Sequence, residues 1–546
     1  MSLIDWIVLI GVLISIIIYG VYKSRTTKNL EGYFLSNRSL PWFLVLMSIM
    51  GTQASAVTFL TGPGQSYSDG MRFVQYYFGL PLAMIVISIF FVPVYNRLKI
   101  YTAYEFLEHR FDVKTRTFTS FLFLLSRGLS TGVSIYAPSL ILSSIMGWNL
   151  YYTNIVMGGV LIIYTMSGGA RAVAYTQVLQ MIIVFVSLFL VGFIAVDLLP
   201  ENVGFSGAVD EARKLGKMNV ITTGVDSNGN FDWKDKYNIW SGLIGGFFLA
   251  LSYFGTDHSQ VGRYLTARNN AESRKGLLMN GLVKVPMQFF ILLIGILVFT
   301  FYLFHKAPVY FDDHKREIAL KTEHRDELLS IEARYDSVFS LGDAQAVQQV
   351  RNEYKAALSK ALPGQEVNDN NYVFLHFVKD HLPVGLIGLL FAVIFLAAWG
   401  SIAAALNSLA ACTMVDFHKK FFVRKDRPVN EYHASQWYTL GWGIFCIIVA
   451  MFANSIGNSL IEAVNILGSL FYGVILGIFL VAFWIRYISG HAVFLSALIS
   501  EALIILIYKM DIISFLWLNV IGALLVIGIG LLLQPLFDIA GKKKAK

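Results

Sequence analysis

Long apolar runs recur along the whole chain and are separated by short charged or Gly/Pro-rich segments. A helix needs about 20 apolar residues to cross the hydrocarbon core of a bilayer, and about 13 runs approach that length. The pattern therefore predicts an all-α integral membrane protein with about 13 transmembrane helices. The predicted spans are residues 3–22, 42–62, 73–96, 120–146, 149–167, 172–199, 238–258, 278–304, 383–411, 435–454, 460–485, 490–508 and 513–534.

Two of these spans contain clusters of glycine, proline and hydroxyl residues. The second reads GTQASAVTFLTGPG at 51–64, and the seventh, five helices later, reads GGFFLALSYFGTD at 245–257. Such a cluster marks either close helix packing or a break in the helix that lines a cavity. Paired interruptions at matching places, in spans 2–6 and 7–11, favour an inverted-repeat transporter whose binding site lies at the membrane midplane.

Composition agrees with a membrane protein. Hydrophobic residues make up 56% of the 546 positions, charged residues make up 14%, and the mean hydropathy is +0.61. The first span carries Asp5 and lacks a basic start and a small-residue cleavage site, so it is interpreted as a retained helix. Cys412 and Cys446 both lie in apolar runs, which excludes a disulfide framework and a thiolate metal site.

Basic residues gather in every second short loop, and such loops remain cytoplasmic. This distribution predicts an outside N-terminus and a cytoplasmic C-terminus. Because these residues lie between apolar spans, the net charge of +8 does not indicate a nucleic-acid partner. The loop residues are Lys23, Arg25, Lys28, Arg38, Arg97, Lys99, Arg110, Lys114, Arg116, Arg263, Arg268, Arg274, Lys275, Lys419, Lys420, Arg424, Lys425 and Arg427, and the basic tail adds Lys542, Lys543, Lys544 and Lys546.

Two long segments, 200–237 and 305–382, are predicted to lie outside. The second contains apolar residues at three- and four-residue spacing among many Ala, Glu and Lys residues, over 314–341 and 343–362. This spacing predicts two amphipathic helices. They form either a partner-binding hairpin or a solvated cap on the outer face, and charged helical faces are more often simply solvated.

Ionisable residues inside a span are costly and are usually paired or functional. Arg127 and Lys284 are the clearest cases, although either could lie near a helix end and extend its charge to the interface. Ala397, Gly400 and Ser401 share one helical face, whose carbonyl and hydroxyl oxygens could bind a monovalent cation or could simply permit packing. Glu501 lies outside the two halves and is expected to be structural.

Four separated motifs resemble the solute:sodium symporter family, which includes sodium-coupled sugar, monocarboxylate, vitamin, iodide, proline and sialic acid carriers. They are YTAYEFLEHRFD at 101–112, SGGARAVAYTQVLQ at 167–180, DHSQVGRYLTARN at 257–269 and SIAAALNSLAACTMVDF at 401–417. The resemblance covers about 30–535. It implies a LeuT-like 5+5 inverted repeat with a broken first helix in each repeat.

The resemblance also implies how the chain is divided. An extra helix and a basic inner loop precede the first five-helix repeat, and an outer loop separates that repeat from the second. The second repeat is interrupted by the long outer loop with its amphipathic helices, and two C-terminal helices with a basic tail follow it. The corresponding segments are 1–41, 42–199, 200–237, 238–304, 305–382, 383–485 and 486–546.

A sodium site is implied by the same resemblance. Its ligands would be backbone oxygens of the first broken helix and oxygens of a small-residue helix, at Gly51, Ala54, Ala397, Gly400 and Ser401. The chain departs from the family at two positions. Gly400 stands where a second hydroxyl is usual, and Gln177 follows Thr176 where the family typically has Asp, which argues against a second sodium.

The implied solute site is less complete. Lys284 matches a lysine of sugar-carrying members, and Tyr253 matches an aromatic residue that closes the pocket on the inner side. Leu80 and Ala250 replace polar sugar contacts, so the pattern favours a monocarboxylate, vitamin or inorganic anion over a hexose. The candidate substrate-binding residues are Gln53, Thr58, Tyr76, Tyr77, Tyr253 and Lys284.

The resulting prediction is a sodium-coupled secondary active symporter that imports a small organic solute or anion by alternating access. It would lie in the plasma (inner) membrane, with the bilayer, sodium and the solute as partners and with no cofactor. Gly400 and Gln177 keep open a proton-coupled carrier or a non-transporting solute sensor of the same fold. An integral-membrane enzyme is a further alternative, but the chain contains no HExxH, GxSxG or Walker-type run.

Overall fold

The computed structural model describes residues 1–24, 30–226, 228–365, 367–422, 430–453 and 460–544. The regular elements of these residues are all helices, and the described chain contains only two isolated β-bridges besides. The prediction of an all-α fold is thus confirmed. Several basic residues of the topology prediction lie outside the described residues or the described side chains. These are Lys23, Arg25, Lys28, Arg424, Lys425, Arg427, Lys542, Lys543, Lys544 and Lys546.

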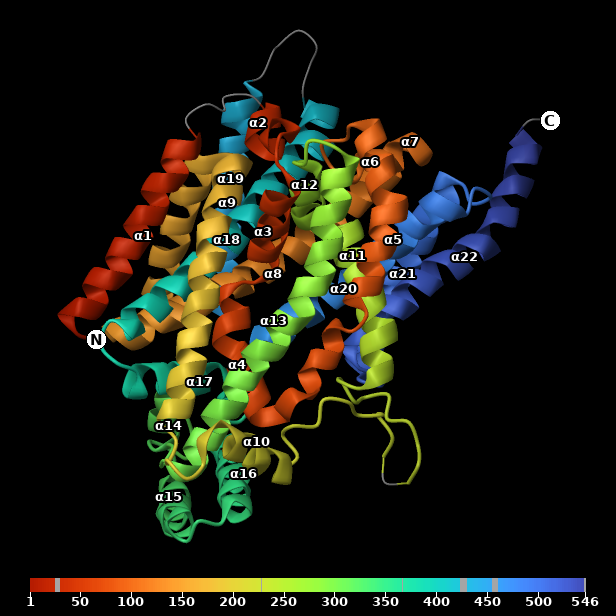
Figure 1. The fold of residues 1–546 in the computed structure, drawn as a ribbon. Helices are drawn as coiled ribbons and strands as arrows, with labels where there is room; N and C mark the ends of the chain where they lie inside the picture. Colours follow the sequence, from red (N-terminus) through yellow and green to blue (C-terminus); the bar gives the residue numbers. More distant parts are fainter. Residues whose placement is uncertain (25–29, 227, 366, 423–429, 454–459, 545–546) are drawn as a thin grey trace.

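Figure 1 follows the helices in chain order. They are α1 (Leu3–Ser24), α2 (Leu30–Leu35), α3 (Trp42–Gln53), α4 (Ala56–Asp69), α5 (Leu80–Val86), α6 (Val92–Leu98), α7 (Glu105–Arg110), α8 (Val113–Met146), α9 (Leu150–Asp197), α10 (Gly204–Lys214), α11 (Gly246–Gly255), α12 (His258–Leu265), α13 (Asn270–Phe304), α14 (Asp313–Ala319), α15 (Arg325–Ser340), α16 (Ala344–Ala361), α17 (Asn370–His381), α18 (Leu386–Cys412), α19 (Glu431–Phe452), α20 (Leu460–Trp484), α21 (Gly490–Met510) and α22 (Phe515–Lys544). Short 3-10 or π-helical turns are η1 (Ser36–Arg38), η2 (Gly70–Tyr77), η3 (Ile87–Phe91), η4 (Ser241–Gly245) and η5 (Thr413–Phe422).

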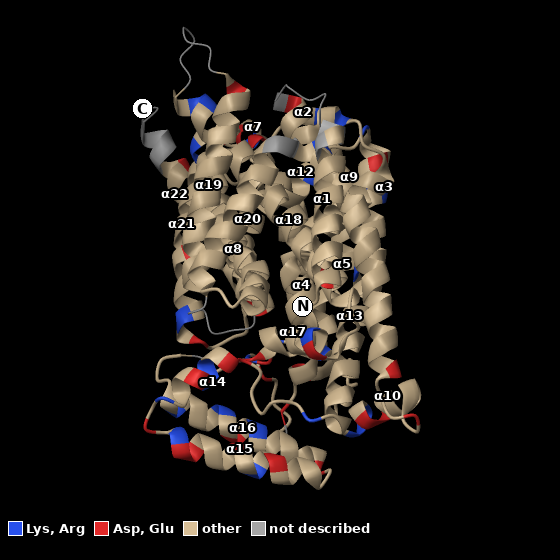
Figure 2. Ribbon diagram, turned by 90° about the vertical axis from the view of Figure 1, so that its left-hand side faces the viewer, with Lys and Arg blue, Asp and Glu red and all other residues tan. Residues whose placement is uncertain are grey.

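Charged residues mark the two ends of the helix bundle. Figure 2 shows most of them at the two ends, with a belt nearly free of charge between. We call the end with α10, α14, α15 and α16 the cap face, and the end with α2, α7 and α12 the basic face (Figures 1 and 2). The C-terminal end lies at the basic face and the N-terminus lies nearer the cap face.

Every predicted span overlaps a helix of the described chain. Ten described helices are long and apolar enough to cross a membrane, and three shorter apolar helices cover Trp42–Gln53, Leu150–Met166 and Ser241–Gly255. The number of crossings remains a prediction. The fifth and sixth predicted spans both fall within α9.

Helix α9 is not straight. The Tyr164 hydroxyl lies 2.9 Å from Oγ1 of Thr176, twelve residues later. A straight α-helix would separate these residues by about 18 Å, because each residue adds about 1.5 Å. The helix therefore bends back between these two residues. The two parts of α9 on either side of the bend correspond to the fifth and sixth predicted spans.

Both predicted helix breaks are present. Helix α3 ends at Ala54, where ψ is 81°, and the next residue, Ser55, is extended before α4 begins. The second break separates α11 from α12 and is held by side chains: Tyr95 and Tyr104 donate to the carbonyl oxygens of Gly255 and Thr256 at 2.8 and 3.0 Å. These hydroxyls satisfy carbonyl groups that the ended helix leaves without partners.

Close backbone contact brings η2 and α5 against η4 and α11. A Cβ atom at Gly79 would lie 2.1 Å from the backbone nitrogen of Phe247, and one at Gly242 would lie 2.1 Å from the carbonyl oxygen of Gln75. Only glycine permits this approach. It places the aromatic side chains of η2 beside α11.

The segment between α13 and α18 forms a small cap. Helices α15 and α16 pack together around Leu328, Tyr335 and Tyr354. The second predicted amphipathic helix, 343–362, corresponds to α16, whereas the first, 314–341, is divided into α14 and α15 by residues 320–324. Nζ of Lys355 lies 2.5 Å from the buried carboxylate of Asp369, where burial would raise the pKa. The charges of Lys355 and Arg351 outweigh burial and hold the pKa of Asp369 below its usual range.

We expect Gly79→Ala to lower the unfolding temperature in detergent, because overpacking a tight contact typically costs about 1–3 kcal/mol. Gly441→Ala is the matched control, since no atom lies within 4 Å of the added Cβ. Equal unfolding temperatures for the two variants would contradict the backbone contact.

Candidate functional site

A cavity of about 110 Å³ lies beside the two broken helices, between η2, α4, α8, α11 and α20. Aromatic and aliphatic side chains dominate its wall, so we call it the aromatic lobe. It is lined by Gln53, Ser55, Val57, Thr58, Tyr76, Tyr77, Leu80, Arg127, Gly246, Leu249, Ala250, Tyr253, Phe254, Ile461, Val464, Asn465 and Tyr472.

A second cavity of about 60 Å³ shares wall residues with the first, among them Gln53, Ser55, Arg127 and Tyr253. Hydroxyl groups of three helices and of the first break line it, so we call it the hydroxyl lobe. These groups belong to Thr52, Ser55, Thr131, Ser134 and Ser401. Together the lobes can surround a solute that carries both apolar and hydroxyl groups.

Arg127 of α8 lies where the two lobes meet. Its Nη2 donates weakly to the Tyr253 hydroxyl at 3.4 Å, and the guanidinium stacks on that ring at 5.5 Å. Nε lies 4.0 Å from Oδ2 of Asp257, which is beyond hydrogen-bond distance, and this buried atom has no hydrogen-bond partner among the described residues. Because Arg127 lines both lobes, the charge of its guanidinium is available to an anion in the cavity.

Tyr253 closes the cavity toward the basic face. Its hydroxyl accepts a hydrogen bond of 2.7 Å from Nε2 of Gln260, in α12, as well as the bond from Arg127. Next to it the Tyr472 hydroxyl donates to Asp257 at 2.8 Å. Side chains of α8, α11, α12 and α20 thus seal this side together.

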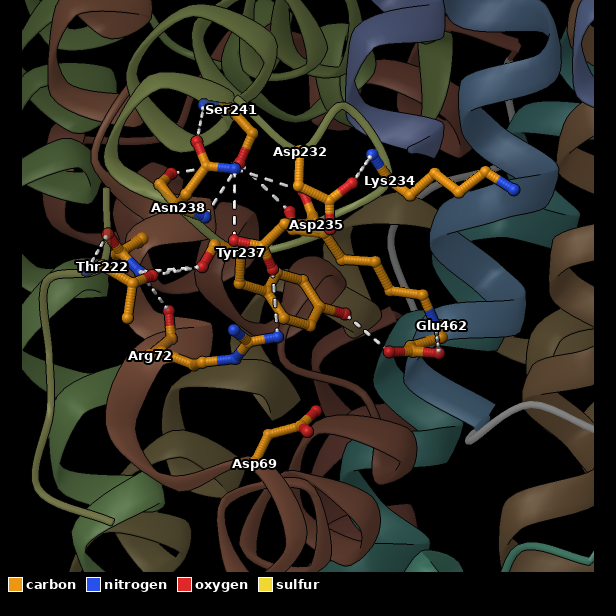
Figure 3. Close-up of polar contacts among 12 residues, drawn as sticks. Asp69, Arg72, Thr222, Asp232, Lys234, Asp235, Tyr237, Asn238, Ser241 and Glu462 are labelled. Carbon is orange, nitrogen blue, oxygen red and sulfur yellow. Dashed lines mark hydrogen bonds and ion pairs between the residues drawn. The ribbon is translucent and has the colours of Figure 1, made fainter. Parts of the chain in front are cut away.

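The cap-face side is closed by two successive contacts. Tyr76 donates to Oδ1 of Asn465 at 3.0 Å, at the wall of the aromatic lobe. One turn earlier on α20, Glu462 accepts from Tyr237 and Lys236, both at 2.9 Å. Figure 3 shows Tyr237 pointing to Glu462 from the segment next to η4. Separation of α20 from η2 and this segment is needed to open the cavity on this side.

Lys284 does not line either lobe. It is fully buried in α13, its Nζ lies 5.4 Å from the centre of the Tyr77 ring, and it has no hydrogen-bond partner in the described part of the chain. Tyr77 does line the cavity. The Tyr77 side chain therefore lies between Lys284 and the cavity.

Two of the five candidate sodium ligands, Gly51 and Gly400, pack against Gln177 of α9. Its Nε2 donates to Thr52 Oγ1 and to the Gly400 carbonyl, both at 3.2 Å. A Cβ atom at Gly51 would lie 2.8 Å from Cγ of Gln177, and one at Gly400 would lie 3.3 Å from it. The two departures from the family pattern, Gly400 and Gln177, are thus neighbours. The Ser401 hydroxyl donates to the Ala397 carbonyl at 2.9 Å.

Five of the six candidate substrate residues line the aromatic lobe, namely Gln53, Thr58, Tyr76, Tyr77 and Tyr253. Sequence reasoning did not assign Asn465, Tyr472 or Asp257. Asn465 could have been found because it is a polar residue within an apolar span. Asp257 could have been recognised as a helix cap because it directly precedes the start of a helix. His258 begins α12 and is buried.

Comparison with known proteins identifies the family of this chain. The model of the sodium:solute symporter family matches residues 33–320 and 349–500. The chain belongs to this family. It is 25% identical to the sodium/sialic acid symporter NanT of Aliivibrio fischeri, over 98% of this chain and 93% of that protein. It is 26% identical to the sodium/glucose cotransporter of Vibrio parahaemolyticus, over 90% and 83%.

A solved structure of a sodium-coupled sialic acid symporter, in a substrate-bound outward-open state, has the same fold. The TM-score is 0.77 at 22% identity, covering 98% of both chains. These findings confirm the LeuT-like fold, multi-pass membrane insertion and sodium-coupled symport of a small solute. This symporter is not an enzyme, and sodium as coupling ion, without a cofactor, agrees with the prediction.

We expect Gly51→Ala to destabilise this symporter by about 1–3 kcal/mol, because its new methyl group would overlap the Gln177 side chain. Adding Gln177→Ala should recover part of that loss, so that the double-mutant cycle gives a coupling of about 1 kcal/mol or more. Unfolding in detergent measures the cycle, with Gly159→Ala as the unhindered control. Additive losses would refute the contact.

Proposed function

We propose that this symporter imports a hydroxylated organic anion and that Arg127 binds the carboxylate of the solute. The observation that carries this proposal is the position of Arg127, which lines both lobes where they meet. None of the residues that line the two lobes carries a carboxylate, so the wall has a positive charge without a negative one of its own. A positively charged cavity raises the affinity for anions.

The side chains that line the two lobes support the other proposed property of the solute, its hydroxyl groups. The hydroxyl lobe offers acceptor oxygens for solute hydroxyls, because the hydroxyls of its helices donate to carbonyl groups one turn earlier. Leu80, Phe254 and Ile461 offer the aromatic lobe only apolar contact. The similarity to sodium/sialic acid symporters also favours a sugar acid, since sialic acid carries a carboxylate and several hydroxyls. Lys284 lies behind Tyr77, with its Nζ 5.4 Å from the ring centre, and does not line the lobes itself.

For the coupling ion we propose backbone oxygens of Gly51, Ala54, Ala397 and Gly400 and the hydroxyl of Ser401. Helix ends leave carbonyl oxygens without helical partners, and small residues allow them to approach a cation. The packing of Gly51 and Gly400 on one side chain supports the closeness of α3 and α18. Sodium held by both helices would stabilise the arrangement that also forms the solute site, so each ligand raises the affinity for the other.

We further propose that the cap face lies outside the cell, in the plasma (inner) membrane. The predicted topology supports this orientation, as do three basic residues at helix ends: Lys99 directly follows α6, and Arg116 and Lys275 lie near the starts of α8 and α13.

Arg127→Gln should weaken binding of the anionic solute roughly 10- to 100-fold, because hydrogen bonds to a charged group contribute about 1.5–3 kcal/mol. The assay is thermal unfolding of the purified protein in sodium chloride, titrated with sialic acid, gluconate, lactate and pyruvate, and with glucose as the neutral control. Lys284→Met is the matched control and should weaken binding less, since its charge lies behind Tyr77. Equal losses for the two variants, or a stronger shift with glucose, would contradict the proposal.

Gln177→Asp should lower the sodium concentration for half-maximal stabilisation by ~10-fold, because a carboxylate adds about 1.4 kcal/mol of attraction beside the proposed ligands. It also removes the donor that now engages the Gly400 carbonyl. Gln177→Asn keeps the amide neutral and serves as the control. An unchanged sodium dependence in Gln177→Asp would place the ion elsewhere.

A further inference from the structure

The carboxylate of Asp257 connects three helices at the second break. Oδ1 accepts from the backbone nitrogen of Ser259 at 2.7 Å and so caps the first turn of α12. Oδ2 accepts from the Tyr472 hydroxyl of α20 at 2.8 Å. On the third side lies Arg127 of α8. Asp257 is fully buried, so its negative charge depends on these neighbours.

The ion pair between Asp257 and Arg127 is open. Its N–O distance is 4.0 Å, whereas Arg116, on the same helix α8, holds Asp416 at 2.6 and 2.8 Å. The Arg116 pair shows the geometry of a closed pair in this protein. Arg127 lies instead between Asp257 and the cavity, where a solute carboxylate would meet the same guanidinium.

Helix α12 has few polar contacts of its own to keep it buried. All eight of its residues are buried, yet several of its polar atoms have no hydrogen-bond partner in the described structure. These atoms are His258 Nδ1, Ser259 Oγ, Gln260 Oε1, Arg263 Nε and Nη1, and Tyr264 Oη. Buried unpartnered groups cost free energy that water would restore. The buried position of α12 therefore depends on its apolar packing and on contacts near its first turn, at Asp257 and Gln260.

We infer that the solute carboxylate competes with Asp257 for Arg127, and that solute binding thereby loosens α12 from α8. This inference rests on the proposed function. A carboxylate in the cavity draws the guanidinium away from Asp257 and from the Tyr253 hydroxyl, which also joins Gln260 of α12. The link between α8 and the first turn of α12 weakens, and the polar side of α12 gains access to water at the basic face. Asp257 is thus a positioning residue that couples solute recognition to opening on that side.

Asp257→Asn tests this coupling, because asparagine keeps a capping oxygen and removes the competing charge. We expect sialic acid and gluconate to bind about 3- to 10-fold more tightly to this variant than to the parent chain, measured by the same thermal-unfolding titration. Asp416→Asn is the matched control, an equally buried carboxylate paired with an arginine of α8 away from the cavity, and should leave the affinity unchanged. Unchanged or weaker binding to Asp257→Asn, with binding still dependent on Arg127, would overturn the inference.

A second measurement does not require the Asp257 variant to fold. Ser259→Cys in the otherwise unaltered chain should react with a membrane-impermeant thiol reagent from the basic face, several-fold faster with sodium and a sugar acid than with sodium alone. The two native cysteines are fully buried and provide the background rate. Equal rates with and without a bound acid would overturn the inference. If none of the four acids binds the parent chain, the proposed function fails first.

Discussion

A helix that stops inside a membrane must find partners for its exposed backbone groups, and the rest of this structure depends on how that constraint is met twice. At the second break the partners are side chains: two tyrosine hydroxyls take the carbonyls of Gly255 and Thr256, and Asp257 caps α12. At the first break the chain turns at Ala54 and Ser55 beside small residues of α18. Protein groups thus satisfy the second break, and the first break is where we propose that sodium binds.

Between the breaks, the placement of a few charges gives the cavity its character. Arg127 lines both lobes, and the carboxylate of Asp257 lies 4.0 Å from its Nε at the start of α12. The same guanidinium can therefore serve recognition and closure. On the cap-face side the contacts involve Asn465 and Glu462 of α20, so α20 takes part in closing both sides of the cavity. An alternating-access cycle requires that these two closures open in turn.

The spans, both broken helices and the amphipathic cap could be read from the sequence, because apolar length, Gly and Thr clusters and helical spacing are local properties. Lys284 shows the limit: its identity suggested a cavity residue, but helix packing turned it behind Tyr77. The bend in α9 and the meeting of Gln177 with Gly400 depend on contacts between distant segments. Asp257 could be recognised as a cap from its position, whereas its closeness to Arg127 needed the folded chain.

Uptake into proteoliposomes tests the central claim most directly. The account predicts that an inward sodium gradient drives a hydroxylated carboxylate, such as sialic acid or gluconate, above its equilibrium level, while neutral glucose is not accumulated. Dissipating the sodium gradient should abolish that accumulation. Accumulation of glucose in preference to the acids, or accumulation of the acids driven equally by a proton gradient in potassium chloride, would contradict the account.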